Sequence, residues 1–321
     1  MKVRVSAPAR LHLGDLDPLA LGRFGYAPIL AIEKPRTVVE VEVSNKLQVD
    51  GVEVDEAWVY AKRVLDAFGF KGAKITVTTT PPRHSGFGST TQLCLAVGKA
   101  ITKAYGLDVP HIELVKVLKR TSTGGIYTFQ LGGFVVAGGF KLKPGERIWL
   151  RENPLIPPLI FRTSFPEEWR FVLVRPLTAP KSPDMEKEEE AFSELRRKKM
   201  SAELVHKGYF ILSAKLLPAL LEKDAESFGR ALTELQVTVG RIYQPVQRSI
   251  FNPASQWLIP ILRRSGALGI GQSSWGPTVY AFTDNPETAQ KIAEKVRVRV
   301  GEKAEVMVVG ADNLGVKVET V

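Results

Sequence analysis

The sequence predicts an α+β fold made of two domains. Strand-like and helix-like segments follow one another along all 321 residues, and the period of the apolar residues distinguishes the two kinds. A proline-rich, irregular stretch at 141–170 separates two parts of similar length, so we place the domains at 1–160 and 161–321. In the second part, the order helix, loop, strand, helix, strand suits a ferredoxin-like unit.

The first domain is expected to open with strands at 2–7 and 36–43, because both stretches alternate apolar and polar residues. The residues between these strands read as a connecting segment in which glycines and basic side chains interleave. A hairpin is expected at 46–54 around Asp50-Gly51, which is a strong turn dipeptide. An amphipathic helix then follows at 57–68.

A strand, a glycine loop and a helix follow one another at the centre of this domain. The strand at 75–79 is β-branched and is stopped by Pro81 and Pro82. Two glycines let the backbone turn and approach a ligand closely, and hydroxyl residues can cap the helix behind them. Free N–H groups and the helix dipole then converge on one spot, which favours phosphate or pyrophosphate. The predicted phosphate-binding residues are Arg83, Gly86, Gly88, Ser89, Thr90 and Thr91.

An ordinary strand-to-helix turn, in which the glycines serve only the geometry, is the alternative for this unit. The loop is also distinct from a Walker A loop, because the pattern GxxxxGK followed by Ser or Thr does not occur in the chain.

The remaining elements alternate in the same way. A helix is expected at 111–120, and a glycine-rich turn at 121–140 runs into a buried strand. A third glycine loop is expected at 269–277, directly before a strand. The other elements expected in the second domain are strands at 171–174, 278–282, 305–309 and 315–318, the last two forming a pair, and helices at 184–200, 203–221, 225–239 and 286–296.

The charge of the chain limits its candidate partners. The chain carries 44 basic and 34 acidic residues, a formal net charge of +10, so it should attract polyanions. Nucleic acid and small phosphorylated substrates are the two candidate classes. The basic run at 196–199 follows the acidic run at 186–190 on one expected helix, which indicates a solvated face of i,i+4 pairs and argues against nucleic acid.

Cysteine content and hydropathy limit the compartment. The apolar runs are shorter than a membrane span, and the N-terminus reads as an alternating strand rather than a signal peptide. The single cysteine, Cys94, excludes an internal disulfide framework and a Cys-based zinc site, and it lies on the apolar face of its helix. We therefore expect a cytoplasmic protein without a membrane partner.

Three motifs resemble, in the same order, those of the GHMP kinase superfamily. They read Pro-Ala-Arg-Leu-His-Leu-Gly at 8–14, Pro-Arg-His-Ser-Gly-Phe-Gly-Ser-Thr at 82–90 and Gly-Gln-Ser-Ser-Trp-Gly-Pro at 271–277. In detail they are more similar to one non-kinase branch, the family of the β-ribofuranosylaminobenzene 5′-phosphate synthases. The motifs together span most of the chain.

The resemblance implies a GHMP kinase-like two-domain fold, with a first domain like domain 2 of ribosomal protein S5 and a ferredoxin-like second domain. It also separates synthase from kinase chemistry. GHMP kinases commonly carry an aspartate in the segment that corresponds to 120–144, and this chain has neither Asp nor Glu there. Relatives in the synthase branch often have an aspartate where this chain has Ala137.

The activity that the resemblance implies is transfer of a phosphoribosyl group from phosphoribosyl pyrophosphate to a small aromatic acid, 4-aminobenzoate or 4-hydroxybenzoate. CO2 and pyrophosphate would be released, in an early step toward the methanopterin-type cofactors of archaea. Such an enzyme is a pentosyltransferase, and we expect it to depend on Mg²⁺ and to form a homodimer. The transfer itself is expected to need little general base, in agreement with the missing acid; this expectation leaves open whether the 4-substituent of the acceptor must lose a proton.

Site residues are assigned partly from their chemistry and partly from the resemblance. The predicted catalytic residues are Arg10, His12 and His84. Trp275 can form a wall for the aromatic ring or serve as an ordinary core residue, and these two roles stay open. The predicted substrate-binding residues are Arg23, Gln92, Gly271, Gln272, Ser273, Ser274, Trp275 and Gly276, and metal ligands are not assigned.

Two alternative functions are kept. The first is an ATP-dependent small-molecule kinase of the same superfamily, which the missing acid disfavours. The second is a non-catalytic, S5-like RNA-binding protein, which only the charge suggests and which steeply salt-dependent binding would reveal.

Overall fold

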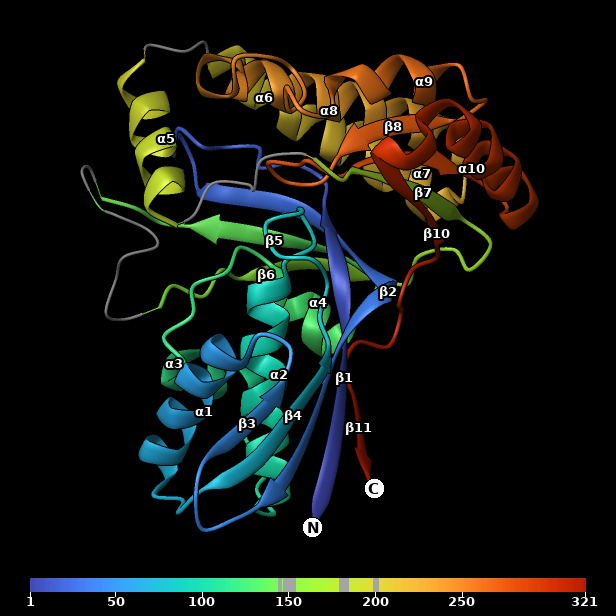
Figure 1. The fold of residues 1–321 in the computed structure, drawn as a ribbon. Coiled ribbons are helices and arrows are strands. Elements are labelled where there is room, and N and C mark those ends of the chain that lie inside the picture. Colours follow the sequence, from blue (N-terminus) through green and yellow to red (C-terminus); the bar gives the residue numbers. More distant parts are fainter. Residues whose placement is uncertain (144–145, 147–153, 179–184, 199–201) are drawn as a thin grey trace.

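The computed structural model describes the chain except for residues 144–145, 147–153, 179–184 and 199–201. Parts of the proline-rich stretch and both ends of the helix predicted at 184–200 therefore lie outside the described residues. The described elements form two sheets, each covered by helices (Figure 1).

The first sheet has seven strands in the described residues, in the order β11-β1-β2-β4-β3, with β5 pairing with β2 and β6 with β5. The long strand β2 pairs with β5 through its first half and with β4 through its second half. The strands are β1 (Lys2–His12), β2 (Phe24–Val43), β3 (Gln48–Gly51), β4 (Ala73–Thr79), β5 (Phe134–Phe140), β6 (Leu159–Thr163) and β11 (Lys317–Thr320). Helices on one side bury its lower half: α1 (Val54–Phe68), α2 (Ser89–Ala104), α3 (His111–Val117) and α4 (Gly125–Leu131) (Figure 1).

The second sheet is antiparallel and confirms the ferredoxin-like prediction. Its order β10-β7-β9-β8 places the fourth strand beside the first and the third beside the second, as in that fold. The strands are β7 (Arg170–Pro176), β8 (Gly269–Gln272), β9 (Val279–Thr283) and β10 (Ala304–Val309). The helices of this part are α5 (Met185–Arg197), α6 (Ala202–Phe210), α7 (Leu217–Glu222), α8 (Ala225–Gln247), α9 (Ile259–Arg263) and α10 (Pro286–Val300). A π-helical segment, η1 (Ile211–Leu216), and two short 3-10 helices, η2 (Gln256–Leu258) and η3 (Gly301–Lys303), complete it.

The end of β1 joins the two halves of the molecule. Successive side chains of a strand point to opposite faces, so Ala9 and Leu11 lie on one face while Arg10 and His12 lie on the other. The apolar pair is buried in a core cluster that also contains Phe228 of α8. The polar pair is thereby directed away from this core.

The predicted domain boundary at 160/161 is wrong. It falls inside β6, which pairs with β5 of the first sheet, and β11 at the end of the chain pairs with β1. The two termini lie together in Figure 1, and the N–H of Val321 donates to the carbonyl of Lys2 at 3.0 Å. Periodicity identifies a strand but not its partners, so the sequence did not show that the end of the chain returns to pair with the first sheet.

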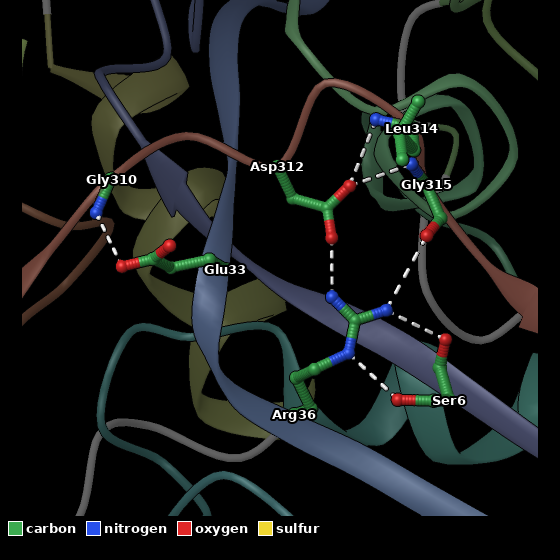
Figure 2. Close-up of polar contacts among 7 residues, drawn as sticks. All are labelled: Ser6, Glu33, Arg36, Gly310, Asp312, Leu314 and Gly315. Carbon is green, nitrogen blue, oxygen red and sulfur yellow. Dashed lines mark hydrogen bonds and ion pairs between the residues drawn. The ribbon is translucent and has the colours of Figure 1, made fainter. Parts of the chain in front are cut away.

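A polar cluster fixes the segment that returns from β10 to β11 (Figure 2). The carboxylate of Asp312 pairs with Arg36 of β2 and accepts hydrogen bonds from the N–H groups of Leu314 and Gly315 at 2.9 and 2.7 Å. Arg36 also donates to the hydroxyl and carbonyl oxygens of Ser6 in β1, at 2.7 and 2.8 Å. The returning segment is therefore bound to the first sheet before β11 begins.

Four other sequence predictions need correction. The segment expected to connect 2–7 with 36–43 is largely strand, because β1 continues to His12 and β2 already begins at Phe24. The hairpin expected at 46–54 is absent, since β3 pairs in parallel with β4. The strand pair expected at 305–309 and 315–318 is divided between the two sheets. The glycine-rich turn at 121–140 also contains α4.

One helical stretch, Ala202–Glu222, is long and apolar enough to cross a membrane by length and composition, contrary to the sequence-based expectation. It comprises α6, η1 and α7. Several of its apolar side chains, including Ile211 and Leu216, are buried in the same cluster as Phe228 of α8. A core helix of a folded domain meets the same test, and this burial favours that interpretation.

Candidate active site

A cavity of about 200 Å³ lies where the two halves of the chain meet. It is bordered by the end of β1, the loop after β4, the N-terminus of α2 and the loop before α4 from the first half. Helices α5 and α8 and the segment after β8 border it from the second half. Its lining is both charged and aromatic, so one ligand could contact both kinds of side chain.

The glycine loop and the first turn of α2 form one wall. Ser89, Thr90 and Thr91 all line the cavity. The residue before them, Gly88, has φ +72° and supplies no side-chain cap, so the N–H groups of the first turn are available to an anion. A Cβ on Gly88 would lie 2.9 Å from Nε of Arg10, which explains the need for glycine there.

Ser273 joins the three sequence motifs. Its hydroxyl accepts a hydrogen bond from the N–H of His12 at 3.0 Å and donates one to the carbonyl of Gly86 at 2.7 Å. Arg10 donates to the same carbonyl at 2.7 Å, and the N–H of Ser274 donates to the carbonyl of His12 at 3.0 Å. Segments 76 to 261 residues apart are thus held within hydrogen-bonding distance.

Basic side chains border the cavity near the helix terminus. Arg10 and Arg120 both line it. Burial lowers the pKa of Arg10 to about 10, so its guanidinium remains charged at neutral pH. Burial and the neighbouring Arg10 hold the pKa of His12 well below its ordinary value, so its imidazole is neutral. His84 also lines the cavity and has φ +55°.

Two acidic side chains line the cavity, Asp15 and Glu188. Burial raises the pKa of each to about 7. Asp15 accepts hydrogen bonds from the hydroxyl of Tyr243 and from the N–H of Asp17. Glu188 accepts a hydrogen bond from Nε1 of Trp275 at 2.6 Å. Both carboxyl groups therefore exchange protons close to neutral pH.

Three aromatic rings gather beside these carboxyl groups. The centroids of Tyr243 and Trp275 are 5.0 Å apart, and the ring of Phe192 lies 5.8 Å from Trp275 and 6.1 Å from Tyr243. All three residues line the cavity. We call this group the aromatic cluster. Its edge-to-face packing leaves an apolar surface against which a flat ring can lie.

The structure brings eleven of the predicted site residues to the cavity wall: Arg10, His12, His84, Gly86, Gly88, Ser89, Thr90, Thr91, Gln272, Ser274 and Trp275. Other predicted residues lie behind it. Ser273 and Gly86 pack together, and a Cβ on Gly271 would meet the hydroxyl oxygen of Tyr280 at 2.4 Å. Gly276, with φ +76°, shapes the turn after Trp275.

Three predicted binding residues are engaged elsewhere in the fold. Arg83 is absent from the cavity lining, because it pairs with Glu53 at 3.1 Å and with Glu56 of α1 at 3.3 Å. Arg23 instead donates to the carbonyls of Gly138 and Gly139 in β5.

Gln92 is the third of these residues. It is fully buried, and its Nε2 donates to the carbonyl of Gly125 at 3.1 Å. Its side chain therefore ties α2 to α4 rather than lining the cavity.

Sequence reasoning missed most of the second-half lining. Asp15 directly follows the first motif, and Arg120 directly precedes the glycine-rich stretch at 121–140. Both could have been predicted as site residues from these positions. Most of the missed residues from the second half lie on helices without a recognisable pattern. They include Glu188 and Phe192 of α5 and Gln236, Tyr243 and Gln247 of α8. Among the described residues, no group of three or more His, Cys, Asp or Glu side chains is placed to hold a metal ion.

Comparisons with known proteins agree with this architecture. The model of the GHMP kinases N terminal domain matches residues 56–133, and that of the GHMP kinases C terminal domain matches 216–302. Homoserine kinase from Cytophaga hutchinsonii superposes with a TM-score of 0.70 at 19% identity, covering 99% of this chain and 97% of that one. At that identity the likeness shows the fold alone.

Two full-length sequence relatives are more informative. β-Ribofuranosylphenol 5′-phosphate synthase from Archaeoglobus fulgidus is 30% identical, with 99% of both chains covered. The protein of the same name from Methanocaldococcus jannaschii is 29% identical, with 98% of this chain and 99% of that protein covered. The matched length includes both halves of the cavity.

Proposed function

Because the chain belongs to the GHMP kinase superfamily, in the family of the β-ribofuranosylphenol 5′-phosphate synthases, we infer that it is a synthase of this kind. The reaction transfers a phosphoribosyl group from phosphoribosyl pyrophosphate to an aromatic acid and releases CO2 and pyrophosphate. The observation that carries the inference is one cavity that contains both the aromatic cluster and a wall formed by the glycine loop, the first turn of α2, Arg10 and Arg120, which we call the anion-binding wall. We propose a role in the formation of methanopterin-type cofactors.

We propose 4-hydroxybenzoate as the acceptor. The relatives are named for a phenol product, and 4-hydroxybenzoate yields a phenol after loss of its carboxylate. The other acceptor considered, 4-aminobenzoate, would give an aniline instead. The two compounds have the same shape, so the aromatic cluster would accept either ring and the polar groups beside it would decide between them.

The anion-binding wall is proposed to hold the pyrophosphate. Negative charge grows on this leaving group as its bond to ribose C1 breaks. The N–H groups at the start of α2 and the guanidinium groups of Arg10 and Arg120 would stabilise that charge. The ribose carbon becomes positively charged, and the ring carbon that bears the carboxylate attacks it.

The aromatic cluster is proposed to hold the acceptor. Apolar walls fix a flat ring in one plane, which directs one ring carbon toward ribose C1. This assigns Trp275 a role at the site, in place of an ordinary core residue. The two alternative functions considered from the sequence explain this site less well. Neither a small-molecule kinase nor an RNA-binding protein requires an aromatic cluster beside an anion-binding wall.

Dependence on Mg²⁺ is a further proposal. A resident metal site does not fit the described residues, which offer no cluster of three suitable side chains. Mg²⁺ is often held largely by substrate phosphates, so we propose that it enters bound to the pyrophosphate group. Cytoplasmic location and a homodimer stay predictions, which cell fractionation and light scattering would test.

The test is release of labelled CO2 from carboxyl-labelled 4-hydroxybenzoate in the presence of phosphoribosyl pyrophosphate and Mg²⁺. Release should require both substrates and should be unaffected by ATP. Two arginine variants serve as a matched pair. Arg10→Ala should lower kcat/KM at least 100-fold, because a charge-assisted donor to the leaving group is lost. Arg83→Ala should stay within about twofold of the wild type.

Two results would contradict this proposal. CO2 release that does not need phosphoribosyl pyrophosphate would exclude the transfer reaction. Loss of activity in Arg83→Ala but not in Arg10→Ala would contradict the site assignment while leaving the reaction itself intact.

A further inference from the structure

Glu188 of α5 stands between the anion-binding wall and the aromatic cluster. Its carboxyl group borders the cavity, and Nε1 of Trp275 donates to its Oε1 at 2.6 Å. Among the described residues, Oε2 has no hydrogen-bond donor, so a ligand in the cavity can supply one. A carboxylate held by the edge of the aromatic cluster is placed to contact a polar substituent on a bound ring.

The surroundings of Glu188 keep it close to a balance between its two protonation states. Burial raises its pKa, while the nearby charges of Arg120 and Arg10 and the hydrogen bond from Trp275 lower it, and the result is about 7. Glu189 on the same helix also acts on it, and Asp15 lies within electrostatic range. A general base is most effective when its pKa lies near the working pH.

We propose that Glu188 accepts the proton of the acceptor's 4-hydroxyl group and returns it after carbon–carbon bond formation. This inference rests on the proposed function. It names a catalytic residue that lies outside the three motifs. It also identifies the side chain that would contact the 4-hydroxyl group of the bound acceptor. The positioning residue is Trp275, which fixes the carboxylate through its indole N–H.

The other acidic residue of the cavity fits this role less well. Asp15 already accepts from the hydroxyl of Tyr243 and from the N–H of Asp17. Taking a proton from a ligand would require it to give up one of these donors. Glu188 needs no such rearrangement, because only one donor in the described part of the chain reaches it.

Each atom and charge in the proposed step is accounted for. The phenolic proton moves to Glu188, and the electron pair left on oxygen raises the electron density at the para carbon, which bears the carboxylate. That carbon forms a bond to ribose C1 as the C1–oxygen bond breaks and pyrophosphate leaves with its electron pair. The ring carbon then loses CO2, the released pair restores aromaticity, and the resulting phenolate recovers the proton from Glu188.

The role predicts a difference between the two acceptors. A hydroxyl group must lose its proton to become a strong electron donor, whereas a neutral amino group already donates its lone pair. Removal of the base should therefore impair 4-hydroxybenzoate much more than 4-aminobenzoate. A fluorinated acceptor, 3,5-difluoro-4-hydroxybenzoate, has a more acidic hydroxyl and is more readily ionised in solution, so it should depend less on the base.

The test compares Glu188→Gln with the wild type for all three acceptors. Glutamine keeps an oxygen for Trp275 but cannot take up the proton. We expect kcat with 4-hydroxybenzoate to fall at least 100-fold, the range of general base catalysis, while its KM changes less than about threefold. The loss should be less than about tenfold with 4-aminobenzoate or with the difluoro acceptor.

The matched control is Glu194→Gln, on the same helix, which removes an exposed pair with Lys198 and should leave all rates unchanged. An equal loss with 4-hydroxybenzoate and the difluoro acceptor would overturn the proposal, and so would full activity of Glu188→Gln. These outcomes are distinct from failure of the proposed function, in which the wild type itself would release no CO2 from any acceptor. If the wild type does not use 4-aminobenzoate, the difluoro comparison alone decides.

Discussion

Burial decides which side chains of the cavity carry charge at neutral pH. His12 is neutral because burial and Arg10 both oppose its protonation, so it can accept or donate a hydrogen bond but adds no charge to the anion-binding wall. Arg10 keeps its charge despite a lowered pKa. The two carboxyl groups lie between these extremes, and their protonation makes the stability of the protein depend on pH.

We predict that Asp15→Asn gains stability relative to the wild type as pH rises from 5 to 8. The pKa of Asp15 is raised from 3.8 to about 7, so the folded state binds more protons than the unfolded state between these values. The free energy of unfolding of the wild type therefore falls through this window, by at most about 1.4 kcal/mol per pH unit for one group. Asparagine cannot titrate, so this contribution disappears.

Urea unfolding of both proteins at pH 5, 6.5 and 8 measures this difference. Because all other titrating groups are shared, their contributions cancel in the comparison. A stability difference that stays constant over the three pH values would show that Asp15 ionises at its ordinary pKa.

At the scale of elements, the structure explains which parts of the site the sequence could predict. Glycines and prolines mark turns locally, so the succession of strand, glycine loop and helix that forms β4 and α2 was predicted from the sequence. Arg10 and His12 were found because their motif is compact, although their place on β1 was missed. Glycine residues at 22 and 25 suggested a connection, whereas pairing with two neighbouring strands extends β2 through that region.

The lining from α5 and α8 could not be predicted, for a physical reason. Glu188 and Tyr243 sit in ordinary amphipathic helices, where an acidic or aromatic residue has many possible roles. Only the packing of these helices around Phe24 of β2 brings the two residues to one cavity. Arg83 shows the converse error. Its position beside the glycine loop suggested that it binds a ligand, but its guanidinium group pairs with the carboxylates of Glu53 and Glu56 instead.

The glycine loop yields a prediction at this scale. Gly88→Ala should weaken pyrophosphate binding at least tenfold, because its new Cβ would lie 2.9 Å from Nε of Arg10 and displace that side chain. Gly69→Ala is the matched control. Gly69 ends α1 with φ +68°, close to the +72° of Gly88, but a Cβ there would meet nothing within 4 Å.

Both variants should lose about 1 kcal/mol of stability from the positive φ. Isothermal titration with pyrophosphate then separates this shared strain from the collision with Arg10. Equal affinity in the two variants would mean that Arg10 can move aside without loss of the anion-binding wall.

At the scale of the whole molecule, the last segment of the chain connects the second sheet to the first and is bound to both. After β10 leaves the second sheet, the carboxylate of Asp312 binds both its own segment and Arg36 of β2, and β11 then completes the first sheet (Figure 2). A second contact lies beside it, where Glu33 accepts from the N–H of Gly310 at 3.0 Å. Since the cavity draws its walls from both halves, this attachment contributes to its shape without lining it.

We predict that Arg36→Ala lowers the free energy of unfolding by about 3 kcal/mol, because it leaves the buried carboxylate of Asp312 without its cation. The matched control is Lys62→Ala, which removes a pair with Asp66, at 2.6 Å, from the exposed face of α1 and should cost less than about 1 kcal/mol. Urea unfolding measures both changes.

Under conditions in which the variant is folded, Arg36→Ala should retain most of the CO2-releasing activity, because the side chain of Arg36 does not reach the cavity. Equal stability of the two variants would mean that Asp312 is satisfied by its backbone donors alone, and that β11 stays paired without the arginine.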